Sequence, residues 1–194
     1  MLINEGGLIR AIKRAYKAGG YTVLNTGNDV AIYTDHWFSM ANRALLPRKV
    51  LATIVEHMGM IPEKDMPTSI IKDTEPQLVL RETAADDMDH WRGGDRGEEV
   101  TMVPVIMQGF QIYQPPGGAC WGVPLYLVDM IERDPAEHIG ADVIDKDRLL
   151  WEADGEAVVI NAVRKACSGW AKEWERAVWN ALEGVDLHKE EAGR

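Results

Sequence analysis

The sequence predicts an α+β fold in which a mainly antiparallel sheet is covered by helices on one face, with a tryptophan-rich helix at the C-terminus. Three observations support this class: an ordinary globular composition, β-rich segments separated by short polar turns, and several amphipathic segments. The 194 residues are 46% hydrophobic and 27% charged, which is typical of a chain with a packed core. We therefore expect one domain over residues 1–185 and a disordered tail over 186–194.

The first predicted helix begins near Leu8. Apolar residues recur from there at helical spacing, basic residues fall on the other side, and a glycine pair ends the pattern. Residues 21–24 and 30–33 are rich in β-formers and are joined by a turn, so they predict a β-hairpin. Residues 37–40 either extend this hairpin as a third strand or open a connecting loop.

A central helix is predicted from Pro47 to Met58. Proline is tolerated in a first helical turn, and the segment carries an apolar stripe that ends before a glycine. Leu51, Ile54 and Val55 belong to this stripe. We expect these three side chains to pack in the core.

The composition changes after two short strands expected at 69–72 and 77–80. Residues 82–99 hold seven acidic and two basic residues, with three glycines and almost no aliphatic side chains. This pattern predicts an exposed, mobile acidic loop over about 84–98. Trp91 lies in its middle, so either the loop folds back onto the domain or Trp91 contacts a partner.

The next apolar run, residues 100–114, predicts two paired strands or one bulged strand. Pro104 lies inside it and favours an edge position, because proline cannot donate a ladder hydrogen bond. Residues 121–130 are apolar enough for a buried strand, although 125–131 also fits a short helix.

The C-terminal segment is expected to be helical. An apolar stripe at helical spacing runs over 158–166, and Trp170, Trp174 and Val178 continue it in steps of four. These tryptophans share a face that buries a large area. That face either packs on the domain's own sheet or forms an oligomer interface, so a homodimer is an alternative.

Charge is unevenly distributed along the chain. The net charge is −10, yet residues 1–50 carry seven basic and three acidic groups. A net-negative surface repels phosphates and anionic membranes, which disfavours direct nucleic-acid binding. Arg10, Lys13, Arg14 and Lys17 form either a local basic patch or an ordinary solvated helix face.

Cys120 is the candidate catalytic residue, because it follows a turn of prolines and glycines at 115–118. A thiolate beside an imidazole acts as a nucleophile, so a small cysteine-dependent hydrolase or transferase is one alternative. The base would come from His36, His57, His90, His138 or His188. The other alternative is that Cys120 is a small buried apolar side chain.

The cysteines, the apolar stretches and the remaining motifs indicate the location of the protein and whether it binds a metal or a cofactor. Two cysteines without a CxxC pair, and no apolar stretch long enough for a membrane span, favour a reducing, cytoplasmic location without a membrane. Residues 142–147 hold three aspartates of a calcium-loop pattern but lack its glycine and closing glutamate. The sequence matches no phosphate-binding glycine loop and no zinc motif, so neither a cofactor nor a metal is expected.

These observations favour a non-enzymatic binding or inhibitory accessory protein. Its acidic, aromatic-bearing surface would dock a basic protein or a nucleoprotein complex. The expected partner-binding residues are Asp86, Asp87, Asp89, Trp91, Asp95, Glu98 and Glu99. In composition the chain resembles phage and mobile-element accessory proteins, including inhibitors of nucleic-acid machinery. A homo-oligomeric structural module is a further alternative.

Overall fold

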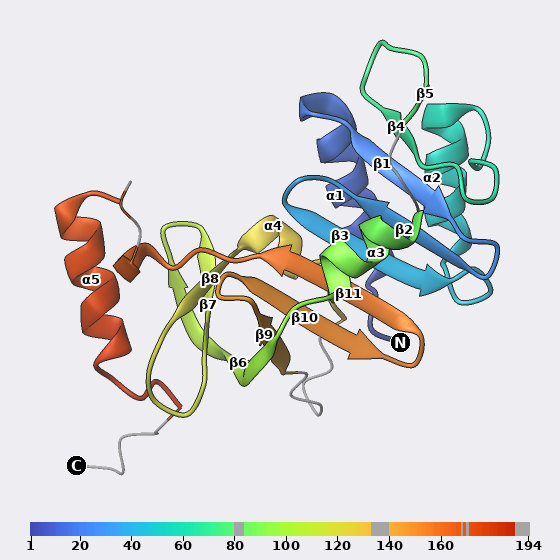
Figure 1. The fold of residues 1–194 in the computed structure, drawn as a ribbon. Coiled ribbons are helices and arrows are strands. Elements are labelled where there is room, and N and C mark those ends of the chain that lie inside the picture. Colours follow the sequence, from blue (N-terminus) through green and yellow to red (C-terminus); the bar gives the residue numbers. More distant parts are fainter. Residues whose placement is uncertain (80–83, 133–139, 168, 170, 189–194) are drawn as a thin grey trace.

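The computed structural model describes residues 1–79, 84–132, 140–167, 169 and 171–188, with the side chains of 84–87 and 167 outside the description. Over these residues the chain forms an 11-stranded sheet in the order β5-β4-β1-β2-β3-β11-β10-β9-β6-β7-β8. Neighbouring strands pair antiparallel. The fold is therefore mixed helix and strand with a large antiparallel sheet, as predicted (Figure 1).

The elements follow one another through mostly short connections. The described helices are α1 (Glu5–Ala18), α2 (Arg48–Met58), α3 (Ala84–Arg92), α4 (Leu125–Val128), the 3-10 helix η1 (Lys165–Cys167) and α5 (Glu173–Glu183). The first strands are β1 (Tyr21–Asn25), β2 (Asp29–Tyr33), β3 (Trp37–Asn42), β4 (Thr68–Ile70) and β5 (Gln77–Leu78). The later strands are β6 (Arg96–Met107), β7 (Phe110–Gln114), β8 (Trp121–Pro124), β9 (Ala141–Ile144), β10 (Arg148–Ala153) and β11 (Glu156–Asn161).

Helices α1 and α2 pack against strands β1, β2 and β3. Asn4 caps α1, because its side-chain oxygen accepts a hydrogen bond from the Gly7 amide at 2.8 Å. Leu8 of α1 and Ile54 of α2 belong to one apolar cluster with alternate side chains of the three strands. Such burial stabilises helices that would be marginal alone in water.

The structure corrects part of the expected core of α2. Ile54 is fully buried and Leu51 is partly buried against the same cluster, whereas Val55 is exposed. The structure also decides two questions that the sequence left open. The segment after Tyr33 forms a third strand, β3, and the segment from Trp121 forms a strand followed by the short helix α4.

Strand β11 differs from the helix predicted over 158–166. It pairs with β3 on one side and with β10 on the other. Val158 enters the cluster beneath α1 and α2, whereas Val159 enters a second cluster on the opposite face of the sheet. A strand buried on both faces carries a continuous apolar run, which the periodicity of the sequence cannot separate from a helix.

Helix α3 occupies the segment where the sequence predicts a loop. Its Trp91 is only 5% exposed and stacks on Phe38 of β3, with ring centroids 5.9 Å apart. Arg92 donates to the Glu152 carboxylate of β10 at 3.0 Å through Nε. This second cluster lies on the sheet face opposite α1 and α2, so the helices are not confined to one face as predicted.

Strand β6 lies between β9 and β7, but Pro104 falls in the part of β6 that pairs on one side only, which agrees with the edge position that proline predicts. It pairs with β9 up to Val100 and with β7 beyond it. Pro104 lies past the last β9 partner and inside a register shift, so its missing N–H breaks no ladder. The buried Gln111 amide bridges the irregularity by donating to the carbonyls of Val103 (2.5 Å) and Val105 (3.1 Å).

Helix α5 lies at the end of the sheet away from α1 and α2 (Figure 1). Its Trp179 is fully buried in a third apolar cluster with Ile112 and Cys120. The largely buried Lys165 ammonium donates to Glu175 of α5 at 2.9 Å and so ties η1 to the helix.

Candidate binding groove

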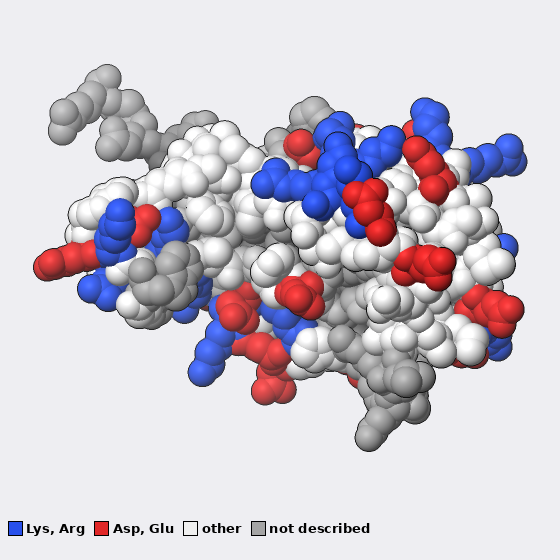
Figure 2. All heavy atoms as spheres, turned by 90° about the horizontal axis from the view of Figure 1, so that it is seen from above, with Lys and Arg blue, Asp and Glu red and all other residues white. Residues whose placement is uncertain are grey.

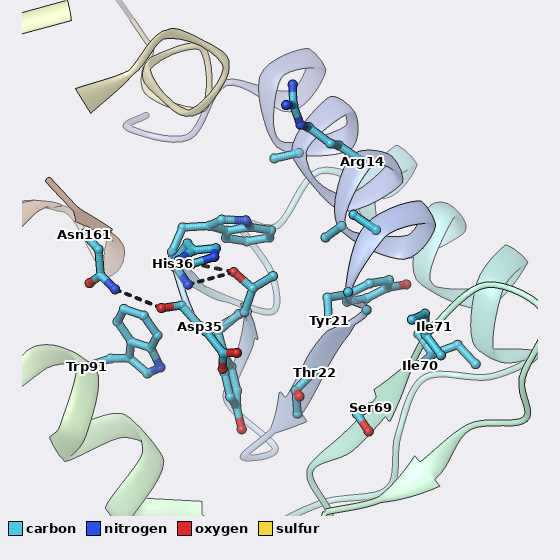
Figure 3. A pocket seen from close by; sticks show the side chains of 18 of the residues that line it. Arg14, Tyr21, Thr22, Asp35, His36, Ser69, Ile70, Ile71, Trp91 and Asn161 are labelled. Carbon is cyan, nitrogen blue, oxygen red and sulfur yellow. Dashed lines mark hydrogen bonds between the residues drawn. The ribbon is translucent and has the colours of Figure 1, made fainter. Parts of the chain in front are cut away.

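A groove of about 920 Å³ crosses the sheet at the ends of several strands. Its walls come from the last turns of α1, the start of β1, the turn between β2 and β3, the β4–β5 segment, the end of α3 and the start of β10. Figure 3 shows Trp91 and Asn161 on one side, Tyr21 and Ile70 on the other, and Asp35 and His36 between them.

Aromatic side chains are among the lining residues of this groove, but most of them expose little surface. Tyr21, Tyr33, Trp37 and Trp91 line it, and each is nearly buried because the sheet or a helix packs on its other side. The half-buried ring of Tyr126 also lines it, beneath the Arg14 guanidinium at 4.0 Å from the ring centroid. The rings are therefore held rigidly, and Tyr126 already shows a cation–π contact.

The turn between β2 and β3 carries the exposed polar side chains of the groove. The Thr34 hydroxyl accepts hydrogen bonds from the amides of His36 (3.1 Å) and Trp37 (3.3 Å). Asn161 of β11 donates to the carbonyl of Asp35 at 2.8 Å (Figure 3). These bonds hold the backbone of the turn, while the side chains of Asp35 and His36 stay exposed.

Arg148 fastens the opposite wall. Its side chain is largely buried and donates to the carbonyls of Trp91 (3.3 Å) and Gly93 (3.1 Å), and also to the carbonyl of His90 and the carboxylate of Asp145. The positive charge is therefore used within the protein, which leaves it unavailable to neutralise a ligand.

Acidic side chains exceed basic ones at the rim. Asp35, Glu75 and Asp147 are exposed lining residues. In the described part of the chain, no hydrogen bond or ion pair engages their carboxylates. Arg14 is the exposed basic residue of the lining. The exposed charge of the groove lining is therefore net negative.

Of the predicted partner-binding residues whose side chains the structure describes, Trp91 alone lines this groove. Trp91 forms part of its wall but is buried, so it is not the exposed aromatic anchor that the sequence suggests. The side chains of Asp86 and Asp87 lie outside the described part. The remaining four are exposed: Asp89 on α3, Asp95 in the connection after it, and Glu98 and Glu99 on β6.

Cys120 has the surroundings of a packed residue. It is fully buried beside Trp179, and its amide donates to the Glu183 carboxylate at 3.1 Å. Burial, reinforced by the Glu183 charge, raises the pKa of the Cys120 thiol to about 11. A thiol in this environment stays protonated near neutral pH and is a poor nucleophile. His138, one candidate base, lies outside the described residues.

The other sequence candidates fall elsewhere. Trp174 is 57% exposed and Val178 is also exposed on α5, whereas Trp170 lies outside the described part. The aspartates of 142–147 lie in β9 and the turn before β10, where Asp145 pairs with Arg148. Over the residues that the structure describes, no group of three or more potential ligands could hold a metal ion.

The basic residues of the first helix lie on its solvated side. Figure 2 shows Lys and Arg side chains gathered over this part of the molecule. Arg10 pairs with Asp129 at 3.3 Å, and Lys49 of α2 pairs with Glu5 of α1 at 3.0 Å, both largely in solvent. Exposed pairs of this kind contribute about 1 kcal/mol or less.

Sequence analysis missed the residues that build the groove. Asn161 and Arg148 act by bonding to backbone groups that are distant in the sequence, and no local pattern indicates such bonds. The Thr34 hydroxyl accepts from amides only two and three residues ahead, which is a local turn pattern. One signal was present: Asp35 and His36 lie in a polar turn between two apolar strands, a position where binding residues are common.

Comparisons with known proteins give little further information. No family model and no curated protein matches the chain. Among solved structures, the chain is similar to a putative DNA polymerase III beta subunit from Eubacterium rectale, with a TM-score of 0.38, 8% identity, and coverage of 91% of this chain and 67% of that one. It is also similar to a DNA polymerase III subunit beta sliding clamp from Bartonella birtlesii, with a TM-score of 0.30, 8% identity and the same coverages. Scores this low establish neither a shared fold nor a shared function.

Within the described segments, no helix is both long enough and apolar enough to cross a bilayer.

Proposed function

We propose that this chain is a non-enzymatic binding protein that takes a basic segment of a protein partner into the groove at the strand ends. The observation that carries the proposal is the set of exposed carboxylates in the groove lining, those of Asp35, Glu75 and Asp147. Lysine and arginine side chains suit this lining, because their positive charge pairs with carboxylates.

The charge of the whole chain supports the same class of partner. At a net charge of −10, long-range attraction speeds the encounter with a basic partner and repels acidic ones. A narrower version is that the partner is a nucleic-acid-binding protein and that the carboxylates occupy positions normally taken by phosphates. Competition between this chain and nucleic acid for such a partner tests that version.

The direct test uses a labelled nona-arginine peptide and its citrulline counterpart, which has a similar shape without charge. Asp35→Asn with Asp147→Asn removes two groove charges. Asp154→Asn with Glu173→Gln removes two exposed charges outside the groove lining. We expect the groove pair to weaken arginine-peptide binding at least ten-fold and the control pair to weaken it less than three-fold. Equal effects of the two pairs, or equal binding of the citrulline peptide, would refute the proposal.

The same three proteins, the wild type, the groove pair and the control pair, identify the natural partner. Each is tagged and passed through lysate at low and high salt, because high salt shortens the Debye length from about 10 Å at 0.1 M to about 3 Å at 1 M. A specific partner is retained by the wild type and the control pair but lost from the groove pair.

A homo-oligomeric module is the second candidate. Trp174 and Val178 lie one helical turn apart on α5 and are both exposed. Trp residues are enriched at protein interfaces. If this face joins two copies, the wild type sediments as a dimer and Trp174→Ala sediments as a monomer.

A further inference from the structure

A second hollow, of about 410 Å³, lies between the end of α2 and the β4–β5 hairpin. Its lining is mostly apolar and is rich in methionine: Met58, Met60, Met66, Pro62, Pro76 and Leu78. Met60 is 61% exposed and Met66 is 40% exposed. Methionine side chains are flexible and polarisable, and such surfaces adapt to varied apolar partners.

The hollow adjoins an open edge of the sheet. Strand β5 is the last strand at this end, and no described strand pairs with its outer side (Figure 1). At the other end, the amides of Gly122 in β8 and of Val163 each donate to the other's carbonyl at 2.9 Å, which covers that edge. An uncovered edge is a template for a further strand.

The register of β5 shows which backbone groups are available. The amide of Val79 donates to the carbonyl of Pro67 at 2.8 Å, and Leu78 lies opposite Thr68. Hydrogen-bonded and non-hydrogen-bonded pairs alternate in an antiparallel ladder. Leu78 is therefore in a non-hydrogen-bonded pair, and its N–H and C=O point away from β4, toward the open side.

The two faces of this hairpin differ. Thr68 and Leu78 line the methionine-rich hollow, whereas their neighbours Ser69 and Gln77 line the groove described above. Side chains alternate between faces along a strand. A strand added beside β5 would therefore place every second side chain over the hollow and the others toward the groove side, where Glu75 is exposed.

Charge distinguishes a foreign partner from a second copy. Residues 59–79 contain four acidic and two basic groups. Both lysines already lie close to neighbouring aspartates, at 3.8 Å for Lys64 and Asp65 and 3.7 Å for Lys72 and Asp73. Two copies joined edge to edge would bring two net-negative rims together, which is unfavourable. A basic segment meets the opposite charge.

We propose that the β5 edge and the methionine-rich hollow form a docking site for an extended segment of another protein, in which apolar and basic residues alternate. The segment adds a twelfth strand to the 11-stranded sheet. The apolar side chains enter the hollow and the basic side chains face the acidic rim. This site shares Glu75 with the groove, but its hollow and its strand edge lie outside the groove lining at Asp35 and Asp147.

The test uses a defined peptide and the methyl signals of methionine in NMR spectra. The probe is an acetylated, amidated eight-residue peptide in which leucine and lysine alternate. We expect the methyl signals of Met58, Met60 and Met66 to shift saturably, while the signal of Met102 stays unchanged. Met102 is 43% exposed but lies on β6, outside both hollows, so it reports non-specific contact. Equal shifts at Met102, or none at the hollow, would overturn the proposal.

Two peptide variants test the two recognition elements. In one variant, the peptide nitrogens that face the β5 edge are methylated, which blocks pairing and should weaken binding at least ten-fold. In the other variant, the alternate nitrogens, which face away from the edge, are methylated, and binding should change little. Replacing the lysines by glutamates should also weaken binding at least ten-fold. A peptide that binds equally well in both methylated forms does not pair as a strand, and this result would contradict the proposal.

Protein variants separate this site from the groove. Met66→Lys should abolish the methyl shifts, while Met102→Lys, its match in exposure, should leave them intact. The groove pair Asp35→Asn with Asp147→Asn should retain the shifts, so the two proposals fail independently. Sedimentation, which measures the oligomeric state, provides a final test. If the wild type dimerises and Met66→Lys does not, the occupant is a second copy and the proposal is wrong.

Discussion

Replacing Trp91 by alanine should release helix α3 from the sheet. Trp91 is 5% exposed and its ring stacks on Phe38, 5.9 Å between centroids. Truncating a buried aromatic side chain of this size costs about 3–5 kcal/mol. The Arg92–Glu152 ion pair is partly exposed and contributes about 1 kcal/mol at most. Arg148 also holds the end of α3 by donating to the carbonyls of Trp91 and Gly93. Trp91 supplies the apolar part of the attachment.

Two measurements check this expectation. Denaturant unfolding should give a free energy of unfolding lower by about 3–5 kcal/mol for Trp91→Ala. Amide exchange and limited proteolysis should become faster over residues 84–98, the segment for which the sequence predicts mobility. Trp174→Ala is the matched control, because its side chain is 57% exposed and surface truncations usually change stability by about 0.5 kcal/mol.

One result would refute the reasoning. If Trp91→Ala unfolds like the wild type, and 84–98 is already cleaved and exchanged rapidly in the wild type, the helix does not rest on the sheet in solution. The predicted mobility of the segment would then hold, and Trp91 would be free to contact a partner.

Three further predictions concern titration and reactivity. Burial lowers the pKa of His57. The unfolded chain therefore takes up the proton at a higher pH than the folded protein, and stability should fall as the pH drops below about 6.5. In His57→Gln, the free energy of unfolding measured with urea should change less between pH 7.5 and 5.5 than in the wild type. The hydrogen bond from Lys165 lowers the pKa of Glu175. The contribution of Glu175 to folding stability is therefore present above the ordinary glutamate pKa of about 4.3 and is lost as the pH falls below it. On acidification, the intrinsic fluorescence of Glu175→Gln should change less than that of the wild type. Cys120, buried and with its pKa raised to about 11, should react with a thiol reagent at pH 7 only after unfolding, and rapid labelling of the native protein would contradict this.

The groove shows why its residues escape sequence analysis. Asn161 reaches the carbonyl of Asp35 because β3 pairs with β11, and Arg148 reaches the end of α3 because that helix folds over the sheet. The Cys120 alternatives illustrate the same limit. A turn and a thiol were visible in the sequence, but burial beside Trp179 and Glu183 decided the pKa of the thiol.

The N-terminal part of the fold could be predicted from the sequence, because its signals are local. The apolar stripe and glycine stop of α1, the β1–β2 hairpin and the stripe of α2 each involve contacts between residues close in the chain. The antiparallel sheet and the α+β class follow from such patterns.

Tertiary structure decided the remainder. Strand β11 and helix α3 contradict the local patterns because each gains more from packing than its intrinsic preference costs. Val158 and Val159 are buried on opposite faces of the sheet, and Trp91 is buried against Phe38. Propensities differ by about 1 kcal/mol or less per residue, whereas burying one large apolar side chain contributes about 1.5–3 kcal/mol. Contacts between distant segments therefore outweigh local preference.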